Sequence, residues 1–509
     1  MRRLLLVLTL GLAAVGWPAV ISAAAVGAAT IQTAGTLQAD FNNDGADDLA
    51  VGAPGEDVGS VVDAGAVNVL YGSAGGITGT GSQLFTQPVS AVEAGDRFGD
   101  VLAAGDFDND GFADLAVGAP FEAVGSRRQA GAVSVLYGSA AGLSASGAQT
   151  FIQVGGTGAE AEDRFGNALA AGDFNNDGAD DLAIGAPQED VGSQLEHAGA
   201  VSVLYGSAAG LATSGSQLFT HPGAVGFGDQ FGAALAAGDF NNDGFADLGV
   251  GVPFQTVGSV NSAGAVSVLY GSGAGLSTAG AQSFSQPVSA VEDTDLFGFS
   301  LAAGDFNGDG FADLGVGAPA EFVGSIREAG AVSALYGSGA GLRTAGAQTF
   351  TQPVSAVEPG DGFAGVVAGG DLNNDGFAEL VVSAVGENVG TRLGAGAVSV
   401  LYGTAGRLTT SGAQTFTQVG GAVEAGDEFG SALAVGDFDN DGVGDLAAGA
   451  AGEGVGSARG AGAVSVVSGT AGRLNTSSGQ LSTQNSTGVA STAEAGDAFG
   501  DALAVGDAG

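Results

Sequence analysis

One acidic turn occurs seven times in this chain at an almost constant interval. Successive copies lie 66 or 67 residues apart, and they begin at Asp40, Asp106, Asp173, Asp239, Asp305, Asp371 and Asp437. A period held this closely over most of a chain indicates one structural unit repeated many times. The sequence therefore predicts seven copies of a single unit.

The second copy, DFDNDGFADLAVGAP, shows the chemistry of the turn. Positions 1, 3, 5 and 9 hold Asp106, Asp108, Asp110 and Asp114, and Gly111 at position 6 permits a sharp bend. Calcium takes six to eight oxygen ligands at roughly 2.3–2.6 Å, whereas magnesium demands stricter octahedral geometry. Two carboxylates about 4 Å apart repel by roughly 4 kcal/mol at an effective dielectric of 20. We therefore expect each turn to close around a calcium ion, with the backbone carbonyl at position 7 as a further ligand.

Each unit reads as four short strands. In the second unit they are expected at 101–105, 115–118, 131–138 and 149–153, where Val, Leu, Phe and Tyr are frequent and Gly, Pro and Asp bound each run. Radial repetition of four-stranded sheets leaves only short edges, and a β-propeller accommodates about four to eight blades. The predicted fold is an all-β, seven-bladed β-propeller of four-stranded antiparallel blades. An open β-solenoid is the alternative.

The two ends of the array suggest how the ring closes. Only residues 35–39 separate the first turn from the preceding segment, and they contain no Phe-Gly pair, whereas Phe499-Gly500 followed by DALAVGD stands after the seventh unit. We expect this C-terminal strand to complete the blade that begins at the N-terminus. The alternative is a chain that stops inside an eighth unit.

Composition limits the partners. The chain has no cysteine and no lysine, and its net charge is −43. Nucleic acid and anionic membrane surfaces are therefore not expected as partners, because both attract clustered positive charge. Halophilic adaptation would also give an acidic surface, but 23 of the 55 acidic residues occupy candidate ligand positions in the seven turns. The lysine-free, Ala- and Gly-rich composition is typical of a bacterial protein.

The N-terminal segment has the pattern of a secretory signal. Arg2 and Arg3 precede an apolar run from Leu4 to Val15 and then small residues with cleavage-like sites around Ala25. We predict a signal peptide over 1–25, a propeller over 26–509, export from the cell, and a monomer with no membrane span in the mature chain. An uncleaved membrane anchor is the alternative.

Two further motifs carry a family resemblance. Phe-Gly pairs recur at Phe98, Phe165, Phe231, Phe297, Phe429 and Phe499, and Gly-Ala-Pro recurs at Gly52, Gly118, Gly185 and Gly317. With the acidic turn, these motifs resemble FG-GAP repeats, which form the seven-bladed propeller of integrin α subunits. The resemblance implies calcium on one face of the disc and ligands or partner subunits on the opposite face.

The resemblance also implies the calcium ligands. Up to seven Ca²⁺ ions would be held by side chains at positions 1, 3, 5 and 9 and by the carbonyl at position 7, namely Asp40, Asn42, Asp44, Ala46 and Asp48; Asp106, Asp108, Asp110, Phe112 and Asp114; Asp173, Asn175, Asp177, Ala179 and Asp181; Asp239, Asn241, Asp243, Phe245 and Asp247; Asp305, Asn307, Asp309, Phe311 and Asp313; Asp371, Asn373, Asp375, Phe377 and Glu379; and Asp437, Asp439, Asp441, Val443 and Asp445. An EF-hand is less favoured, because position 12 holds valine in several turns rather than a bidentate glutamate.

The sixth unit departs most from the pattern. It has Ala364 after Phe363, Glu379 in place of the last aspartate, and Ser383 in place of the first glycine of Gly-Ala-Pro. We expect its site to bind calcium most weakly. The leg domains and membrane span of integrins have no counterpart in this sequence, so a transmembrane receptor is not expected.

An enzyme is not predicted. Thiol chemistry is impossible without cysteine, no Gly-x-Ser-x-Gly motif occurs, and His197 and His221 are interpreted as surface residues. A calcium ion that activates water is less favoured than one that fastens a turn. FG-GAP repeats are also appended to glycosylphosphatidylinositol-specific phospholipase D, but the His-rich catalytic part of that enzyme has no counterpart here.

The most favoured function is a secreted adhesion or recognition module for a protein or glycan ligand. The Val-Gly-Ser and Val-Gly-Thr turns, such as Val58–Ser60, Val124–Ser126 and Val389–Thr391, are expected on the face opposite the calcium turns and could contact that ligand. They could equally be solvated turns with a purely structural role. A non-catalytic protein of the cell envelope, or a degenerate phospholipase-related propeller, are the alternative functions.

Overall fold

A computed structural model describes residues 40–505, apart from residues 90, 154, 156–157, 193–194, 224–225, 289 and 355. The predicted signal peptide over 1–25 lies outside these residues. The described residues form strands, turns and loops, and they contain no helix that could cross a membrane.

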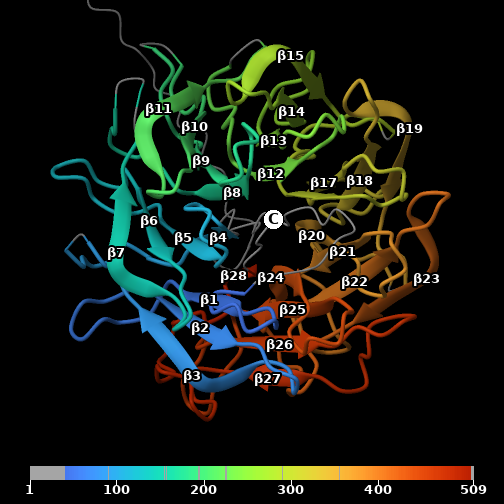
Figure 1. Cartoon of the computed structure of the whole chain (residues 1–509). Coiled ribbons are helices and arrows are strands. Elements are labelled where there is room, and N and C mark those ends of the chain that lie inside the picture. Colours follow the sequence, from blue (N-terminus) through green and yellow to red (C-terminus); the bar gives the residue numbers. More distant parts are fainter. Residues whose placement is uncertain are drawn as a thin grey trace, which may run out of the picture.

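Seven four-stranded antiparallel sheets surround a central axis (Figure 1). The predicted seven-bladed β-propeller is confirmed. The first, innermost strands of the blades are β28 (Ala502–Val505), β4 (Val101–Gly105), β8 (Ala168–Gly172), β12 (Leu235–Gly238), β16 (Leu301–Gly304), β20 (Phe363–Gly370) and β24 (Phe429–Gly436). The second strands are β1 (Leu49–Ala53), β5 (Asp114–Ala119), β9 (Asp181–Ala186), β13 (Asp247–Val252), β17 (Asp313–Ala318), β21 (Glu379–Ala384) and β25 (Asp445–Ala450).

The two outer positions of each blade follow the same order. The third strands are β2 (Ala66–Tyr71), β6 (Ala132–Tyr137), β10 (Ala200–Tyr205), β14 (Ala265–Tyr270), β18 (Ala331–Tyr336), β22 (Ala397–Tyr402) and β26 (Ala463–Val467). The outermost strands are β3 (Thr78–Phe85), β7 (Ser144–Phe151), β11 (Ala212–Phe219), β15 (Ser277–Phe284), β19 (Arg343–Phe350), β23 (Thr409–Phe416) and β27 (Gln480–Ser482).

The outermost strands begin earlier than the sequence predicts. The prediction for the second blade was 149–153, but β7 begins at Ser144 and ends at Phe151. Its first half is exposed and consists of small and polar residues, because the edge of a blade has no neighbour to pack against. A strand of this kind lacks the apolar signal on which the prediction relied.

The ring closes through its two ends. Strand β28 pairs antiparallel with β1, with Leu503 opposite Val51 and Val505 opposite Leu49. It also contacts β24 and β4, the innermost strands on either side. The expected completion of the first blade by the C-terminal strand is confirmed, so the first and last strands of the described residues share one sheet.

The Phe-Gly and Gly-Ala-Pro motifs pack against each other between blades. The Phe98 ring is fully buried, and the Gly99 amide donates to the Gly118 carbonyl at 3.1 Å. Gly99 has a φ of +91°, which favours glycine, and a side chain at Gly52 in the preceding blade would collide with the Gly99 carbonyl. The two glycines therefore let the backbones of adjacent blades come into direct contact.

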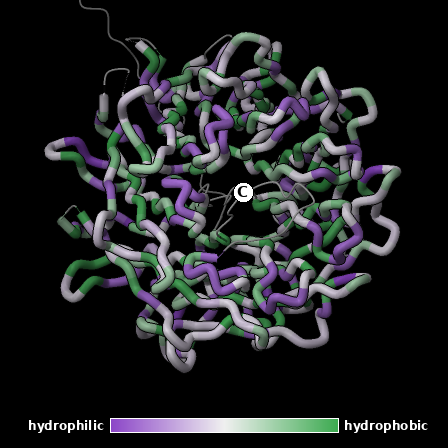
Figure 2. The backbone as a smooth tube through the Cα atoms, in the orientation of Figure 1, coloured by the Kyte–Doolittle hydropathy of each residue, from purple (hydrophilic) through white to green (hydrophobic). Residues whose placement is uncertain are grey.

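The core lies between adjacent sheets. One cluster of buried side chains joins Val101 and Leu115 of the second blade to Leu169 and Leu182 of the third. Hydrophobic and hydrophilic stretches alternate in every sector of the disc (Figure 2), as expected where each strand packs on neighbours and its connecting loops reach solvent. Each blade thus depends on the next to bury its apolar surface.

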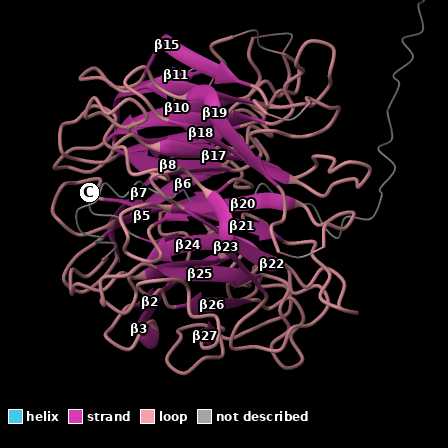
Figure 3. Cartoon of the chain, turned by 90° about the vertical axis from the view of Figure 1, so that its right-hand side faces the viewer, coloured by secondary structure: helices cyan, strands magenta, loops and turns pink. Residues whose placement is uncertain are grey.

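Loops project from both faces of the disc (Figure 3). The two faces carry different sets of loops. We call one the acidic-loop face: it carries the turns between first and second strands, for example residues 106–113. We call the other the opposite face: it carries the loops between second and third strands, such as 120–131, and the connectors between blades, such as 86–100. The alternation of antiparallel strands places these two sets of loops at opposite strand ends.

Candidate metal centres

Each acidic turn is ordered by hydrogen bonds to its own carboxylates. In the second blade, the amides of Asp110 and Gly111 donate to Asp106 at 3.1 and 2.9 Å, and the Phe112 amide donates to Asp110 at 3.0 Å. Asn109 at position 4 has a φ of +54°, a conformation that asparagine tolerates better than most residues. The turn therefore directs several oxygens toward its own centre.

The acid at position 9 joins three segments of its blade. Asp114 is fully buried as the first residue of β5 and accepts the Phe107 amide at 2.9 Å and the Gly138 amide at 2.8 Å. Gly138 directly follows the third strand, β6. The equivalent bond to the glycine after the third strand occurs in all seven blades, to Asp48, Asp114, Asp181, Asp247, Asp313, Glu379 and Asp445. Position 9 thus has a structural role that the sequence analysis missed, although the recurring Leu-Tyr-Gly at the end of the third strand signals it.

The side chain at position 3 carries an oxygen without a hydrogen-bond partner in several turns. Oδ1 of Asp108, Asn241, Asn373 and Asp439 is buried and has no hydrogen-bond partner. A buried polar atom is normally paired, so each of these oxygens is available to a ligand. Carboxylate oxygens of Asp106, Asp108 and Asp114 lie within 4.8 Å of one another, and so do those of Asp437, Asp439 and Asp441. A set of oxygen donors with this spacing fits a hard cation such as calcium.

Burial and mutual repulsion oppose ionisation of these turns. Desolvation, aided by the other acids of the turn, raises the pKa of the acid at position 9 to about 8 in Asp48, Asp114, Asp181, Asp247 and Asp313, to about 9 in Glu379, and to about 7 in Asp445. Because these pKa values exceed those of an unfolded chain, the fold without a cation loses stability as the pH rises through that range. A bound divalent ion would offset the charge of the ionised carboxylates and so remove this loss of stability.

Neighbouring turns are joined around the ring. The amide at position 8 of one blade donates to the carbonyl of the position 1 aspartate of the preceding blade. The bonds are Ala113 to Asp40, Asp180 to Asp106, Ala246 to Asp173, Ala312 to Asp239, Ala378 to Asp305, and Asp47 to Asp437, all between 2.9 and 3.2 Å. An ion that orders one turn would therefore also order the contact with the next blade.

The comparisons with known proteins identify the repeat. A family model described as FG-GAP repeat matches residues 35–70, 98–136, 165–204, 231–269, 297–335, 363–401 and 429–467. The chain belongs to the FG-GAP repeat family. The matched segments contain all seven acidic turns and both motifs that pack between blades, so the resemblance noted in the sequence is confirmed.

Curated relatives of this FG-GAP propeller are much longer proteins. The chain is 38% identical over 180 residues to phosphatidylinositol-glycan-specific phospholipase D of Rattus norvegicus, covering 34% of this chain and 20% of the relative. It is 34% identical to integrin alpha pat-2 of Caenorhabditis briggsae, covering 44% and 18%. The matches thus span about a fifth of these relatives. Among solved structures, a Dos1 propeller matches with 13% identity and a TM-score of 0.42, covering 83% of this chain and 79% of the other.

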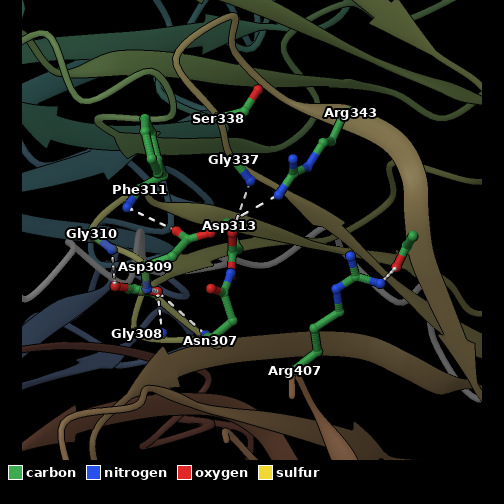
Figure 4. Close-up of polar contacts among 12 residues, drawn as sticks. Asn307, Gly308, Asp309, Gly310, Phe311, Asp313, Gly337, Ser338, Arg343 and Arg407 are labelled. Atoms are coloured by element: carbon green, nitrogen blue, oxygen red, sulfur yellow. Dashed lines mark hydrogen bonds and ion pairs between the residues drawn. The ribbon is translucent and has the colours of Figure 1, made fainter. Parts of the chain in front are cut away.

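The fifth and sixth turns of the FG-GAP propeller differ from the rest. In the fifth, Arg343 at the start of β19 reaches toward the turn, with its guanidinium 4.0 Å from Asp309 (Figure 4). In the sixth, the Gly403 amide lies 3.4 Å from Glu379, whereas the equivalent bond to Asp313 is 2.8 Å. The longer side chain of Glu379 therefore changes the position of the carboxylate, as its extra methylene suggests.

One histidine is placed differently from the prediction. His221 is only 5% exposed, packs edge-on against Phe231, and accepts the Gly223 amide through Nδ1 at 3.1 Å. The interpretation of His221 as a surface residue is therefore wrong. The residue occupies a buried position that holds glutamine in the other blades, a signal that a comparison of the repeats could have revealed.

Proposed function

We propose that this protein is a secreted, calcium-binding FG-GAP propeller that recognises a protein or glycan ligand with its opposite face. The observation that carries the calcium part is the buried, unpartnered oxygen at position 3 of the turns, as in Asp108 and Asp439. The residues that would hold the ions are the five per turn predicted from the sequence. The proposal includes the backbone carbonyls at position 7 as ligands and a full set of seven ions.

Calcium would supply positive charge where each blade concentrates carboxylates. The chain's own residues do the rest: Asp106 and Asp110 shape the turn, and Asp114 ties it to the second and third strands. A ligand that binds only the folded state at about 100 times its Kd adds about 2.7 kcal/mol of stability. Several filled sites would therefore make the disc strongly dependent on calcium.

The opposite face carries most of the exposed apolar side chains. Seven of the eight large hydrophobic residues that are exposed lie in its loops and connectors: Val62, Val89, Ile152, Phe227, Val288, Val354 and Leu393. Phe227 and Leu393 are 68% and 69% exposed. Exposed aromatic and aliphatic side chains on a rigid ring are typical of surfaces that bind a partner. This distribution supports recognition on the opposite face.

The relatives favour a binding role over catalysis. Integrin alpha proteins and phosphatidylinositol-glycan-specific phospholipase D share the propeller segment with this chain. Since the matches span about a fifth of these proteins, the phospholipase name gives no support for hydrolysis by the propeller itself. Within this proposal the propeller is non-catalytic, monomeric and exported.

The test combines ligand screening with variants on the two surfaces. The purified protein is applied to arrays of extracellular proteins and glycans in calcium and then in a chelator. We expect calcium-dependent binding that Phe227→Ser and Leu393→Ser weaken and that Leu84→Ser, on the outer strand β3, leaves unchanged. Binding that survives both opposite-face substitutions would contradict the assignment of the face. Strong stabilisation by calcium without any ligand would instead favour a structural role in the cell envelope.

A further inference from the structure

A buried cluster of three polar side chains occurs at the junction of the first two blades, on the opposite face. Gln87 follows β3, Asp96 precedes the Phe98-Gly99 pair, and Glu122 lies in the loop after β5. Their exposed fractions are 8%, 2% and 7%. The Gln87 amide donates to Glu122 at 2.7 Å, and the carboxyl groups of Glu122 and Asp96 are hydrogen-bonded to each other.

The cluster recurs around the ring. Six junctions hold the same three residue types, as Gln87, Glu122 and Asp96; Gln153, Glu189 and Asp163; Gln286, Glu321 and Asp295; Gln352, Glu387 and Asp361; Gln418, Glu453 and Asp427; and Gln484, Glu56 and Asp497. The glutamine amide donates to the glutamate at 2.5 to 3.2 Å in five of them. Each cluster joins one blade to the next, far from the acidic turns.

The groups around each pair are acidic, with one exception. The neighbouring acids are Glu93 for the Glu122 pair, Glu160 and Asp190 for the Glu189 pair, Glu292 and Asp293 for the Glu321 pair, Glu358 for the Glu387 pair, Glu424 for the Glu453 pair, and Glu494 and Asp57 for the Glu56 pair. Among the described residues, Arg392 is the one cation beside these pairs, and it lies near Asp427. At four of the junctions the two carboxyl groups are hydrogen-bonded to each other, in the pairs Glu122 and Asp96, Glu189 and Asp163, Glu321 and Asp295, and Glu453 and Asp427. Two carboxyl groups this close resist ionising together, because like charges repel and the pKa of one of them is raised.

We propose that four of these junctions, those of Glu122, Glu189, Glu321 and Glu453, each hold one shared proton below neutral pH, carried by the glutamate and donated to the neighbouring aspartate. The glutamine amide donates to the other side of the same glutamate, so the proton completes a chain of hydrogen bonds across the blade junction. These protons would then stabilise the contacts between blades on the opposite face, and the contacts would weaken as the protons are lost.

The junction between the third and fourth blades supports this assignment. At the equivalent glutamate position the fourth blade has Gln255, whose backbone N–H donates to the Val252 carbonyl and whose backbone carbonyl accepts the Gly264 N–H, as in the Glu122 loop. Asp229 stands in the place of Asp96, and His221 replaces the glutamine donor. Glutamine has the shape of a protonated glutamic acid and keeps a permanent donor. Where the acid is absent, the chain has thus substituted a residue that needs no proton.

The electrostatics agree with this geometry. Burial first, and then the neighbouring acids, raise the pKa of Glu122, Glu189, Glu321 and Glu453 to about 7. The pKa in the folded state exceeds the ordinary value of 4.5, so this stabilisation is complete below pH 4.5 and is lost as the pH rises through 7.

The test replaces one glutamate by glutamine, which mimics the shape of the protonated acid. Urea unfolding of the wild type, Glu122→Gln and the exposed control Glu196→Gln is followed from pH 5 to 8 in saturating calcium. Between these pH values we expect the folding equilibrium of Glu122→Gln to gain about ten-fold or more over the wild type, and that of Glu196→Gln to follow the wild type. Glu321→Gln at another junction should reproduce the gain, which guards against a local folding defect at residue 122.

Two outcomes would overturn the proposal. If Glu122→Gln and Glu321→Gln lose stability in parallel with the wild type as the pH rises, the glutamates carry no proton. If either substitution lowers the number of calcium ions bound per chain, the junction is a cation site. An unchanged calcium count separates this proposal from the proposed function, because the acidic turns are untouched.

Discussion

Replacing Asp108 by asparagine should have opposite effects with and without calcium. Asp108 supplies the carboxylate at position 3 of the second turn, where the first, third, fourth, fifth and sixth turns have asparagine. The substitution keeps an oxygen at that place and removes one negative charge. It therefore tests charge separately from shape.

The magnitude follows from the spacing of the acids. Carboxylate oxygens of Asp106, Asp108 and Asp114 lie within 4.8 Å of one another, and two unit charges at that distance repel by about 3.5 kcal/mol at an effective dielectric of 20. Asp108 is partly exposed, so solvent screening reduces the relief on substitution to about 1–2 kcal/mol. In a chelator, Asp108→Asn should therefore be more stable than the wild type. In calcium it should lose about ten-fold or more in affinity at that turn, equivalent to about 1.4 kcal/mol.

Urea unfolding in chelator and in calcium, together with calorimetric titration, measures both effects. The matched control is Asn241→Asp in the fourth turn, which adds a carboxylate beside Asp239 and should reverse both signs. Equal destabilisation by Asp108→Asn in chelator and in calcium would show that position 3 has only a packing role. An unchanged titration would refute the assignment of Asp108 as a ligand.

Three further substitutions test other parts of the structure. Gly99→Ala should cost about 2 kcal/mol in urea unfolding, because φ is +91° and a Cβ would lie 2.7 Å from the Ala66 carbonyl oxygen; a neutral result would contradict the close packing of blades. Glu379→Asp should strengthen the sixth turn by shortening the bond to Gly403, and calcium titration should then show a tighter site rather than an unchanged one. Leu503→Asp should lower the melting temperature sharply, since this buried residue of β28 faces β1 in the closing sheet; a stable variant would argue against closure by that strand.

The sequence predicts the repeated parts of the structure well, because their signals recur at regular spacing. The acidic turns, the Phe-Gly pairs and the closing strand at Phe499 to Val505 all have regular spacing and strong local chemistry. The outer strands are less predictable: β7 is exposed over its first half, so its start leaves no apolar pattern. Local sequence therefore locates the inner part of a blade better than its edge.

Contacts between blades are the part that the sequence conceals. The bond from Gly138 to Asp114 joins residues from different strands, and the Gln87, Asp96 and Glu122 cluster joins two blades. Neither contact can be inferred from the spacing within one turn, because it depends on how the strands return and how the sheets stack. His221 was misplaced for the same reason: its buried position is set by the junction.

The count of calcium ions bound by metal-stripped protein tests the central claim most directly. Equilibrium dialysis against calcium, with the melting temperature recorded on the same samples, should give several ions per chain, up to seven, and a melting temperature that rises with occupancy. Protein that binds no calcium under these conditions, or that melts at the same temperature with and without it, would contradict the account.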